Sequence, residues 1–345
     1  MFYSFKFKTK LQIFSVLLIS IFHPLFADGY VSIIGARNQG DHIFESGNKY
    51  PNLSGIKGGS RITYARNFNY GGFQLGFYHN KFLVTMKYTT TGWYINPGDS
   101  RDEDFVMGSI STEKGTKFAP ERFTLYDTAH TYTGTVNFAD GHTRSSMKEY
   151  GGDAFMRYYF GKATPDPFSI NSGFFASLGV RYKFFKYYLY DVIQFIDSKP
   201  VYYGPIGLGL SYSHTMVEFP LGLGYLFSFK NISIEPSVHI LYAYNKARDF
   251  HYQRALNFLS SNSGLGFLVN FEFFYKLPQY DSLFRIGYYA HRQFTRGGFT
   301  TKGGLTLNDM LSNYQGAFRD YIDTKEAGIE VAYIKKFYLE PKKTE

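Results

Sequence analysis

Two short clusters of carboxylates and histidine are the residues in this sequence best suited to acid–base chemistry. They lie in Arg101–Phe105 (RDEDF) and Arg248–Tyr252 (RDFHY). An aspartate two residues from a histidine on one strand face can orient the imidazole and stabilise its charged form, so that the histidine takes a proton from water. A carboxylate pair opposite could hold that water and share a proton, because close like charges resist joint ionisation. The spacing is therefore compatible with hydrolysis by an activated water.

Other interpretations of the same residues stay open. Asp99–Asp104 also fits a solvated acidic loop, or a weak calcium loop of the D-x-D type. His251 also fits a hydrogen-bonded histidine at the rim of a fold. The chain has no cysteine, which excludes disulfides and thiolate metal sites. We expect no metal and no organic cofactor at either cluster.

The elements that must position these residues are predicted by an alternation of apolar and polar side chains. In Ile232–Asn245 the even positions are apolar and the odd positions are mostly polar. Phe82–Tyr88, Leu265–Lys276 and Ala327–Tyr333 repeat the pattern. Successive side chains of a β-strand point to opposite faces, so each segment has one apolar and one polar face.

The alternation also predicts which way the second cluster points. If it continues beyond residue 245, Asp249 and His251 share the inward, polar face of that strand. It gives no answer for Asp102 and Asp104, because Pro97–Gly98 interrupts the strand before them. Only the Asp249-x-His251 pair can therefore be assigned to a face from the sequence.

The connections between the strands alternate between short and long. Outer-membrane barrels have short turns at one end and long loops at the other, on an even number of strands, with aromatic girdles that match the many Phe and Tyr here. We predict an all-β fold, a ten-stranded antiparallel transmembrane barrel with both termini at the short-turn end. A soluble β-sandwich, which also alternates, is the competing interpretation. Short turns are expected at His79–Asn80, Gly161–Gly173, Lys230–Asn231 and Pro278–Asp281, and long connections around residues 38–60, 96–142, 190–204, 246–263 and 295–320.

Composition narrows the class of protein further. The 345 residues carry a net charge of +9, with 20% aromatic and 19% charged side chains. A mean hydropathy of −0.25 excludes a bundle of membrane helices. The aromatic content excludes a disordered chain. The basic excess contains no Lys/Arg block, so we expect no nucleic-acid partner.

The N-terminus predicts export. Residues 1–10 are basic, Leu11–Phe22 is an apolar run of signal-peptide length, and Ala27 supplies a small residue before the polar start of the mature chain. The run is shorter than the ~20 apolar residues that a spanning helix needs. We predict a signal peptide over 1–27, the barrel over 28–337, and a charged tail over 338–345. The mature protein is expected in the outer membrane.

The length of the chain predicts a barrel that extends beyond the bilayer. Ten strands leave about 30 residues per strand and half-connection, whereas crossing takes only about 9–11. The surplus should stand above the membrane on the long-loop side, where its wall can hold a site. Because a ten-stranded barrel fills its lumen with side chains, we do not expect passage of large solutes.

The combined motifs resemble the omptins, ten-stranded outer-membrane aspartyl endopeptidases. Gly92–Trp93 precedes Asp102–Phe105, where the family has Asp-x-Asp-Trp, and Asp249–Tyr252 matches its Asp-x-His-Tyr. Tyr212–Gly224 looks like the sixth strand of the family, and Ala327–Ile329 resembles its last strand. The similarity covers most of the mature chain, thinly.

This resemblance implies specific roles. Asp102 and Asp104 would be the carboxylate pair, and Asp249 and His251 the dyad that activates water, without an acyl-enzyme. Asp41 would be one acid of a pocket for a basic side chain. The resemblance further implies polypeptide substrates cleaved at the extracellular face, and a dependence on bound lipopolysaccharide. We expect a monomer.

Several positions depart from the family pattern. Ala247 stands where the second pocket acid belongs, which weakens the expected preference for basic residues. The loop over 105–142 is longer and contains a competing Asp127-Thr128-Ala129; if that were the true equivalent, the protein would be an inactive relative. Arg66, Arg181 and Lys183 are candidates for lipid contact by position alone. The alternative function is a non-catalytic barrel for adhesion or binding at the cell surface.

Overall fold

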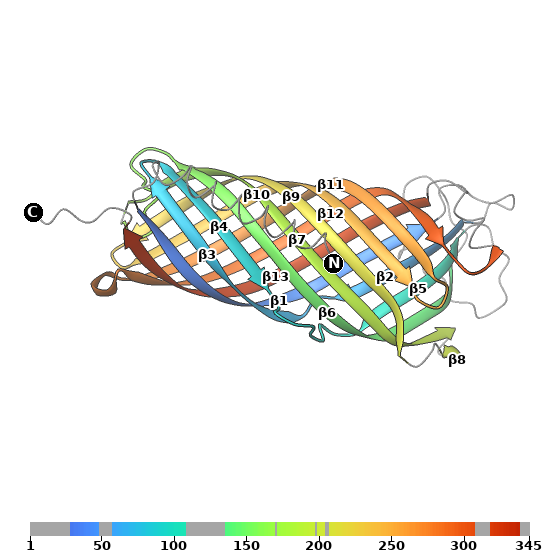
Figure 1. The fold of residues 1–345 in the computed structure, drawn as a ribbon. Coiled ribbons are helices and arrows are strands. Elements are labelled where there is room, and N and C mark those ends of the chain that lie inside the picture. Colours follow the sequence, from blue (N-terminus) through green and yellow to red (C-terminus); the bar gives the residue numbers. More distant parts are fainter. Residues whose placement is uncertain are drawn as a thin grey trace, which may run out of the picture.

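The chain forms an elongated β-barrel in a computed structural model (Figure 1). The structure describes residues 28–47, 57–107, 135–169, 171–196, 199–203, 207–307 and 318–338. The expected signal peptide over 1–27, the competing Asp127 motif and the tail beyond Tyr338 lie outside these residues. Within them, no helix is long and apolar enough to cross a membrane.

A single antiparallel sheet contains all the strands of the described chain. Only one 3₁₀ turn, Pro278–Tyr280, is added to them in these residues. The strands are β1 (Asp28–Gly47), β2 (Lys57–Ala65), β3 (Phe68–His79), β4 (Phe82–Thr90), β5 (Ser100–Met107), β6 (Thr135–Tyr159), β7 (Gly173–Ile196), β8 (Lys199–Tyr203), β9 (Leu208–Phe229), β10 (Ile232–His251), β11 (Leu256–Leu277), β12 (Ser282–Gly303) and β13 (Phe318–Tyr338).

These segments make a ring of ten strands, as predicted. β2 and β3 are two parts of the second ring strand, which breaks at Arg66 and Asn67, and β4 and β5 are two parts of the third, which breaks over residues 91–99. β8 pairs only with the long-loop end of β7 among the described strands. The ring closes where β1 pairs with β13 along its whole length, from Asp28 opposite Tyr338 to Gly47 opposite Arg319.

The two ends of the barrel differ as expected. Tight turns at Asn80–Lys81 and Lys230–Asn231, together with the 3₁₀ turn, gather at the end where β1 starts and β13 finishes (Figure 1). The bounds of the long connections were predicted too widely, since β1 continues to Gly47 and β12 to Gly303. Residues 246–263 are mostly strand, because β10 continues to His251 and β11 begins at Leu256. The polar residues of this segment are typical of a loop in the sequence, but in the structure they belong to a part of the barrel wall whose outer face is polar.

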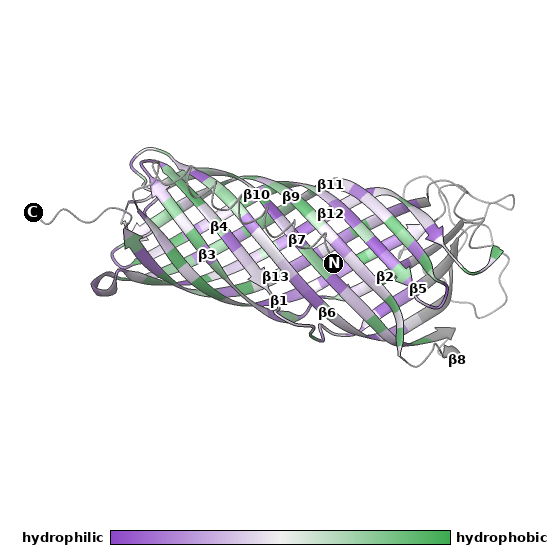
Figure 2. Cartoon of the chain, in the orientation of Figure 1, coloured by the Kyte–Doolittle hydropathy of each residue, from purple (hydrophilic) through white to green (hydrophobic). Residues whose placement is uncertain are grey.

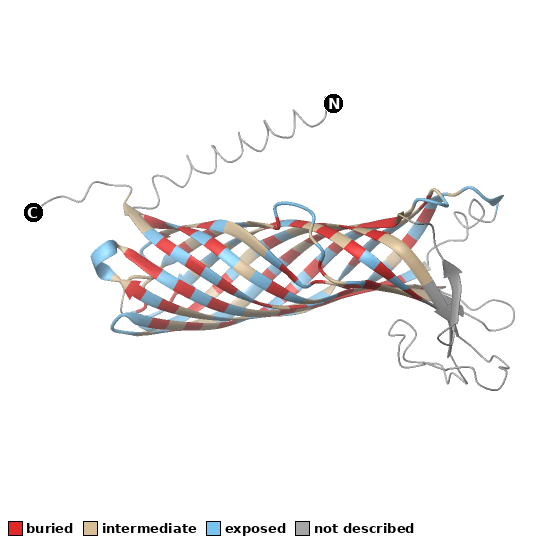
Figure 3. Cartoon of the chain, turned by 90° about the horizontal axis from the view of Figure 1, so that it is seen from below, coloured by how far each residue is buried: buried red, intermediate tan, exposed pale blue. Residues whose placement is uncertain are grey.

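Alternate residues point into the lumen and out of the barrel, which gives the wall its chequered burial pattern (Figure 3). At the short-turn end the outward residues are large and apolar, as with Ile33 on β1 and Ile240 on β10, which are 71% and 69% exposed. Exposed apolar side chains on this scale fit a lipid-facing band. Nearer the long-loop end the wall becomes more polar (Figure 2). The strands therefore extend beyond the band, as their length predicted.

The lumen is filled with side chains and contains two apolar layers. The layer at the short-turn end includes Tyr30, Phe175 and Leu283, with Ala163 and Phe168 from the segment that follows β6. Nearer the long-loop end, aromatic side chains form a second layer, which we call the aromatic layer. It consists of Phe44, Ile62, Tyr64, Phe68, Met147, Phe185, Tyr187, Leu189, Leu210, Tyr212, Ala247 and Ile322.

Candidate functional site

The Asp249 and His251 side chains form a hydrogen-bonded pair at the lumenal rim. Both lie at the end of β10 on the face that includes Glu235, Ser237 and His239, as the alternation predicted. His251 Nε2 is 3.0 Å from Asp249 Oδ2. The Asp249 side chain is 4% exposed, whereas that of His251 is 28% exposed. The pair thus has one buried acid and one imidazole that solvent can reach.

The charge on His251 is stabilised by its surroundings. Burial disfavours the imidazolium, but the charge and hydrogen bond of Asp249 outweigh burial, and Asp102 adds to them. Arg254 acts in the opposite direction. The pKa of His251 is therefore raised above its ordinary value. An imidazole with a raised pKa is a stronger base toward a bound water once it is neutral.

Asp102 lies on the same lumenal face of a different strand. It is in register with Ile62 on β2, which in turn is in register with Phe44 on β1. Ile62 and Phe44 belong to the aromatic layer, so Asp102 shares their lumenal face. Ser60 Oγ donates a long hydrogen bond of 3.4 Å to Asp102 Oδ1. The structure therefore places Asp102 within electrostatic reach of His251, as the acid–base hypothesis requires.

The other two predicted site residues are Asp104 and Asp41. The backbone of Asp104 pairs with Ser60 and Ala139, but its side chain lies outside the described part of the structure. Asp41 is exposed on the outer face, whereas its neighbour His42 is buried in the lumen. The structure does not bring Asp41 to the other residues, because even-numbered positions of β1 face inward. The sequence indicated this direction, because the apolar, lipid-facing Val31 and Ile33 are also odd-numbered.

Sequence reasoning missed the polar groups set in and beside the aromatic layer. His42 Nε2 is 2.7 Å from the Tyr212 hydroxyl, and His42 Nδ1 is 2.8 Å from Thr324 Oγ1. The Tyr212 hydroxyl is also 3.1 Å from His214 Nδ1. Burial is the main cause that lowers the pKa of both histidines, that of His214 to about 3. Both imidazoles are therefore neutral and act as hydrogen-bonding groups that tie β1, β9 and β13 together.

A further lumenal carboxylate, Asp320 on β13, was also missed. It is fully buried and accepts a hydrogen bond from Ser260 on β11. Ser260 is in register with Ala247, the position where the sequence lacked an acid. Burial raises the pKa of Asp320 to about 6. No lone feature of the sequence signalled it, because the contact depends on strands that are distant along the chain.

Between the two apolar layers the lumen contains a ladder of ion pairs. Arg66 bridges Glu149 and Glu326, and Arg181 bridges Asp153 and Glu218. Arg66, Arg181 and Lys183 therefore face the lumen, which corrects their assignment as lipid contacts. Further rungs of the ladder join Lys183 to Glu326, Lys87 to Asp153 and Glu330, Arg285 to Glu330 and Glu272, and Arg157 to Glu235.

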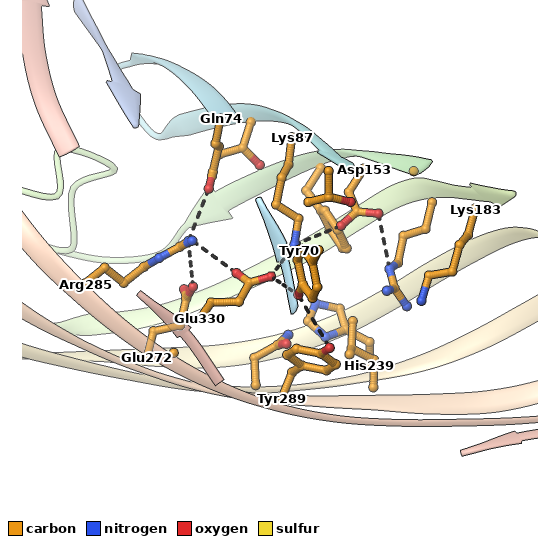
Figure 4. Close-up of a pocket in the computed structure, with 18 of the residues that line it drawn as sticks. Tyr70, Gln74, Lys87, Asp153, Lys183, His239, Glu272, Arg285, Tyr289 and Glu330 are labelled. Carbon is orange, nitrogen blue, oxygen red and sulfur yellow. Dashed lines mark hydrogen bonds and ion pairs between the residues drawn. The ribbon is translucent and has the colours of Figure 1, made fainter. Parts of the chain in front are cut away.

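A cavity of about 110 Å³ opens inside this ladder (Figure 4). Glu330 lies between Lys87 and Arg285 in this view, and Tyr70 donates to it at 2.8 Å. A volume of this size holds a cluster of water molecules. The cations and carboxylates that line it are already paired with one another, so the cavity offers no unbalanced charge to a solute.

Basic side chains ring the outside of the wall beyond the apolar band. They belong to several strands, and the exposed members include Arg248 on β10 and Arg296 on β12. We call this group the outer basic belt. It consists of Arg37, Lys148, Lys186, Lys246, Arg248, Arg292, Arg296 and Lys325.

Fold and surface together define an outer-membrane β-barrel. The chain belongs to the family described as "Putative porin", which matches residues 49–331. No curated protein matches the sequence.

Among solved structures, the outer membrane protease OmpT from Escherichia coli superposes with a TM-score of 0.57 at 9% identity, over 88% of this chain and 96% of that chain. The translocator domain of the autotransporter NalP from Neisseria meningitidis gives a TM-score of 0.35 at 10% identity, over 97% of this chain and 98% of that chain. The similarity to OmpT shows a common barrel fold. Membership of the omptin family does not follow from an identity this low.

Proposed function

We propose that the protein is a surface endopeptidase in which the Asp249–His251 pair activates a water molecule that attacks a peptide bond. The observation that carries this proposal is the hydrogen-bonded acid–imidazole pair on the lumenal face, opposite a strand that bears Asp102. A neutral His251 takes the proton of the attacking water as the tetrahedral intermediate forms. It then returns the proton to the leaving amine, which restores the neutral imidazole.

Carboxylates and apolar groups complete the proposed site. Asp102, with Asp104 as its proposed partner, would hold the water from the opposite wall of the mouth. The aromatic layer below it limits access of bulk water from the lumen. Asp41 would meet a substrate only on the outer surface of the rim, so we expect cleavage near basic residues without a strict demand for them.

The family description favours a second candidate, a channel. The water-sized cavity within the ion ladder is the observation that supports it. Against it, apolar layers lie on both sides of the ladder, and the paired charges would have to separate for a solute to pass. Binding or adhesion at the outer surface without catalysis is the third candidate, and it requires neither acid–base chemistry nor an open lumen.

One set of measurements separates the three candidates. Purified full-length protein, reconstituted with lipopolysaccharide, is incubated with a peptide library that contains basic residues, and product formation is followed by mass spectrometry. We expect cleavage by the wild type and none by His251→Ala. His142→Ala is the matched control, because His142 is an exposed histidine on the outer face of β6.

The outcomes of that experiment are distinct. Equal product from the wild type and His251→Ala would contradict the enzyme proposal. Stable single-channel conductance in a planar bilayer, together with no cleavage, would favour the channel. Neither cleavage nor conductance would favour binding or adhesion. Heat-modifiable migration on gels reports in each case whether the variant barrel is folded.

We also propose that the long-loop end faces the outside of the cell and that the outer basic belt binds lipopolysaccharide. The belt lies directly beyond the apolar band, where the phosphates of an outer leaflet would be found. Loss of two belt charges in Lys246→Gln/Arg248→Gln should weaken binding of lipopolysaccharide to the detergent-solubilised barrel. Protease digestion of intact cells should cut the long-loop segments if the orientation is as proposed, and leave them uncut if it is reversed.

A further inference from the structure

Within the described part of the chain, two of the buried polar atoms that lack a hydrogen-bond partner lie near the dyad and are complementary. Asp249 uses Oδ2 to bind His251, while its Oδ1 is unpaired. The hydroxyl of Tyr64, a residue with no exposed surface, is also unpaired. One atom is an acceptor and the other carries a donor hydrogen. A buried polar group without a partner is destabilising, so a complementary pair of such groups at one level of a lumen points to a partner that both share.

The rings around Tyr64 place it at the level of Asp249. Tyr64 lies on β2, and its ring stacks on that of Tyr212 with centroids 4.5 Å apart and an interplanar angle of 22°. Tyr212 lies on β9 in direct register with Asp249 on β10. Tyr64 thus approaches the dyad across the lumen, through the side chain next to Asp249.

Electrostatics link the same groups. Burial, and next the charge of Asp249, hold the pKa of Tyr64 well above its usual range, with smaller effects from Tyr212, Asp102 and Tyr187. Tyr64 is therefore un-ionised at physiological pH and keeps its hydrogen to donate. Among the carboxylates of the described residues, Asp249 acts most strongly on it.

We propose that Tyr64 is a positioning residue for the dyad, and that its hydroxyl donates a hydrogen bond to a water molecule that in turn donates one to Asp249 Oδ1. This bond fixes the plane of the carboxylate, so that Oδ2 stays directed at His251 Nε2. It also spreads the negative charge of Asp249 over two donors. The inference rests on the proposed function only for its effect on catalysis; the hydrogen bond itself is independent of it.

Removal of the hydroxyl has a defined consequence. In Tyr64→Phe, Asp249 loses one donor, its charge acts more fully on His251, and the protonated imidazole gains stability. The groups that face His251 are Asp249 and Asp102, which favour its charged form, and Arg254, which opposes it. None of these is altered by the substitution. The pKa of His251 should therefore rise by roughly half a unit or more.

The experiment is an NMR titration of ¹⁵N-histidine in the full-length, micelle-reconstituted protein, with the His251 signal assigned by its loss in His251→Ala. We compare the wild type, Tyr64→Phe and Tyr187→Phe. Tyr187 is the matched control because it is a fully buried member of the aromatic layer whose hydroxyl donates to the Ala65 carbonyl and not to the dyad. We expect a rise in the His251 pKa in Tyr64→Phe alone.

Three results would overturn the inference. An unchanged His251 pKa in Tyr64→Phe, or an equal rise in Tyr187→Phe, would mean that Tyr64 acts on the dyad only through general packing. In an Asp249→Asn background the effect of Tyr64→Phe should vanish, and persistence of the full shift there would also refute the bond.

Cleavage assays add a separate readout. If the wild type cleaves peptides, Tyr64→Phe should lower kcat with little change in KM and move the acid limb of the rate profile to higher pH. If the wild type cleaves nothing, the proposed function fails while the titration still decides the role of Tyr64.

Discussion

Arg66 is the side chain whose removal should reveal most about how the lumen is stabilised. It is fully buried at the break between β2 and β3, where it pairs with Glu149 on β6 and Glu326 on β13. Its guanidinium also lies over the Phe185 ring, 4.3 Å from the centroid. Arg66 thereby links the aromatic layer to the top of the ion ladder.

The magnitude of the effect follows from what each carboxylate retains. In Arg66→Met, Glu326 keeps Lys183 at 2.6 Å, whereas Glu149 keeps Lys183 only at 3.9 Å. Glu149 is then a largely uncompensated charge in the lumen. Removing one partner of a buried ion pair costs about 3–5 kcal/mol, and the partial compensation by Lys183 places the expected loss near the lower end of that range. Arg66→Met/Glu149→Gln should recover a large part of it.

The assay is equilibrium unfolding of the barrel in detergent micelles by urea, followed by tyrosine fluorescence and gel migration. Arg37→Met is the control, since Arg37 is exposed on the outer face and bonded to Asn69. We expect the control to change the free energy of unfolding by less than about 0.5 kcal/mol. If Arg66→Met and Arg37→Met are equally stable, the lumenal ion ladder does not contribute to the stability of the barrel.

Three further predictions follow from the same geometry. Asp249→Asn removes the charge that raises the pKa of His251, while the burial that lowers this pKa remains. The pKa of His251 should therefore fall by about 1–2 units in an NMR titration, and the acid limb of any activity should move to lower pH in the rate profile. An unchanged pKa would make Asp249 a rim residue without influence on His251. His42 and His214 have folded pKa values below their unfolded value of about 6.5, so each contributes stability that is present above that pH and lost below it. For His214, whose folded pKa is about 3, the loss is about 2 kcal/mol between pH 7 and pH 5. Replacing His214 by Gln should flatten the pH dependence of unfolding, and an identical pH dependence would contradict the assignment. Ser260→Ala removes a donor from buried Asp320 and should raise the pKa of that carboxyl above about 6, which infrared titration of the carboxyl band can test against a Ser261→Ala control on the outer face.

The sequence by itself was sufficient for the barrel and for part of the site. Strict alternation in segments such as Ile232–Asn245, the tight turns and the surplus strand length depend only on local side-chain order, so they predicted the ring of strands, its extension beyond the apolar band and the inward direction of Asp249 and His251. Parity is a local property of an uninterrupted strand. It failed to place Asp102 because residues 91–99 break the strand before it.

The tertiary structure decided which residues meet across the lumen. Tyr64, Tyr212 and Asp249 come from strands that are far apart in the sequence, and Asp320 reaches Ser260 only through the register of β11, β12 and β13. The ion ladder likewise joins residues such as Arg66 and Glu326, 260 positions apart. These contacts follow from the closure of the sheet and from strand register, which sum over the whole ring and leave no periodic signal within any one segment. The outward direction of Asp41 could have been predicted from the sequence, because the alternation along β1 places odd-numbered residues on the outer face. The motif resemblance instead implied a place in the substrate pocket, and it was followed.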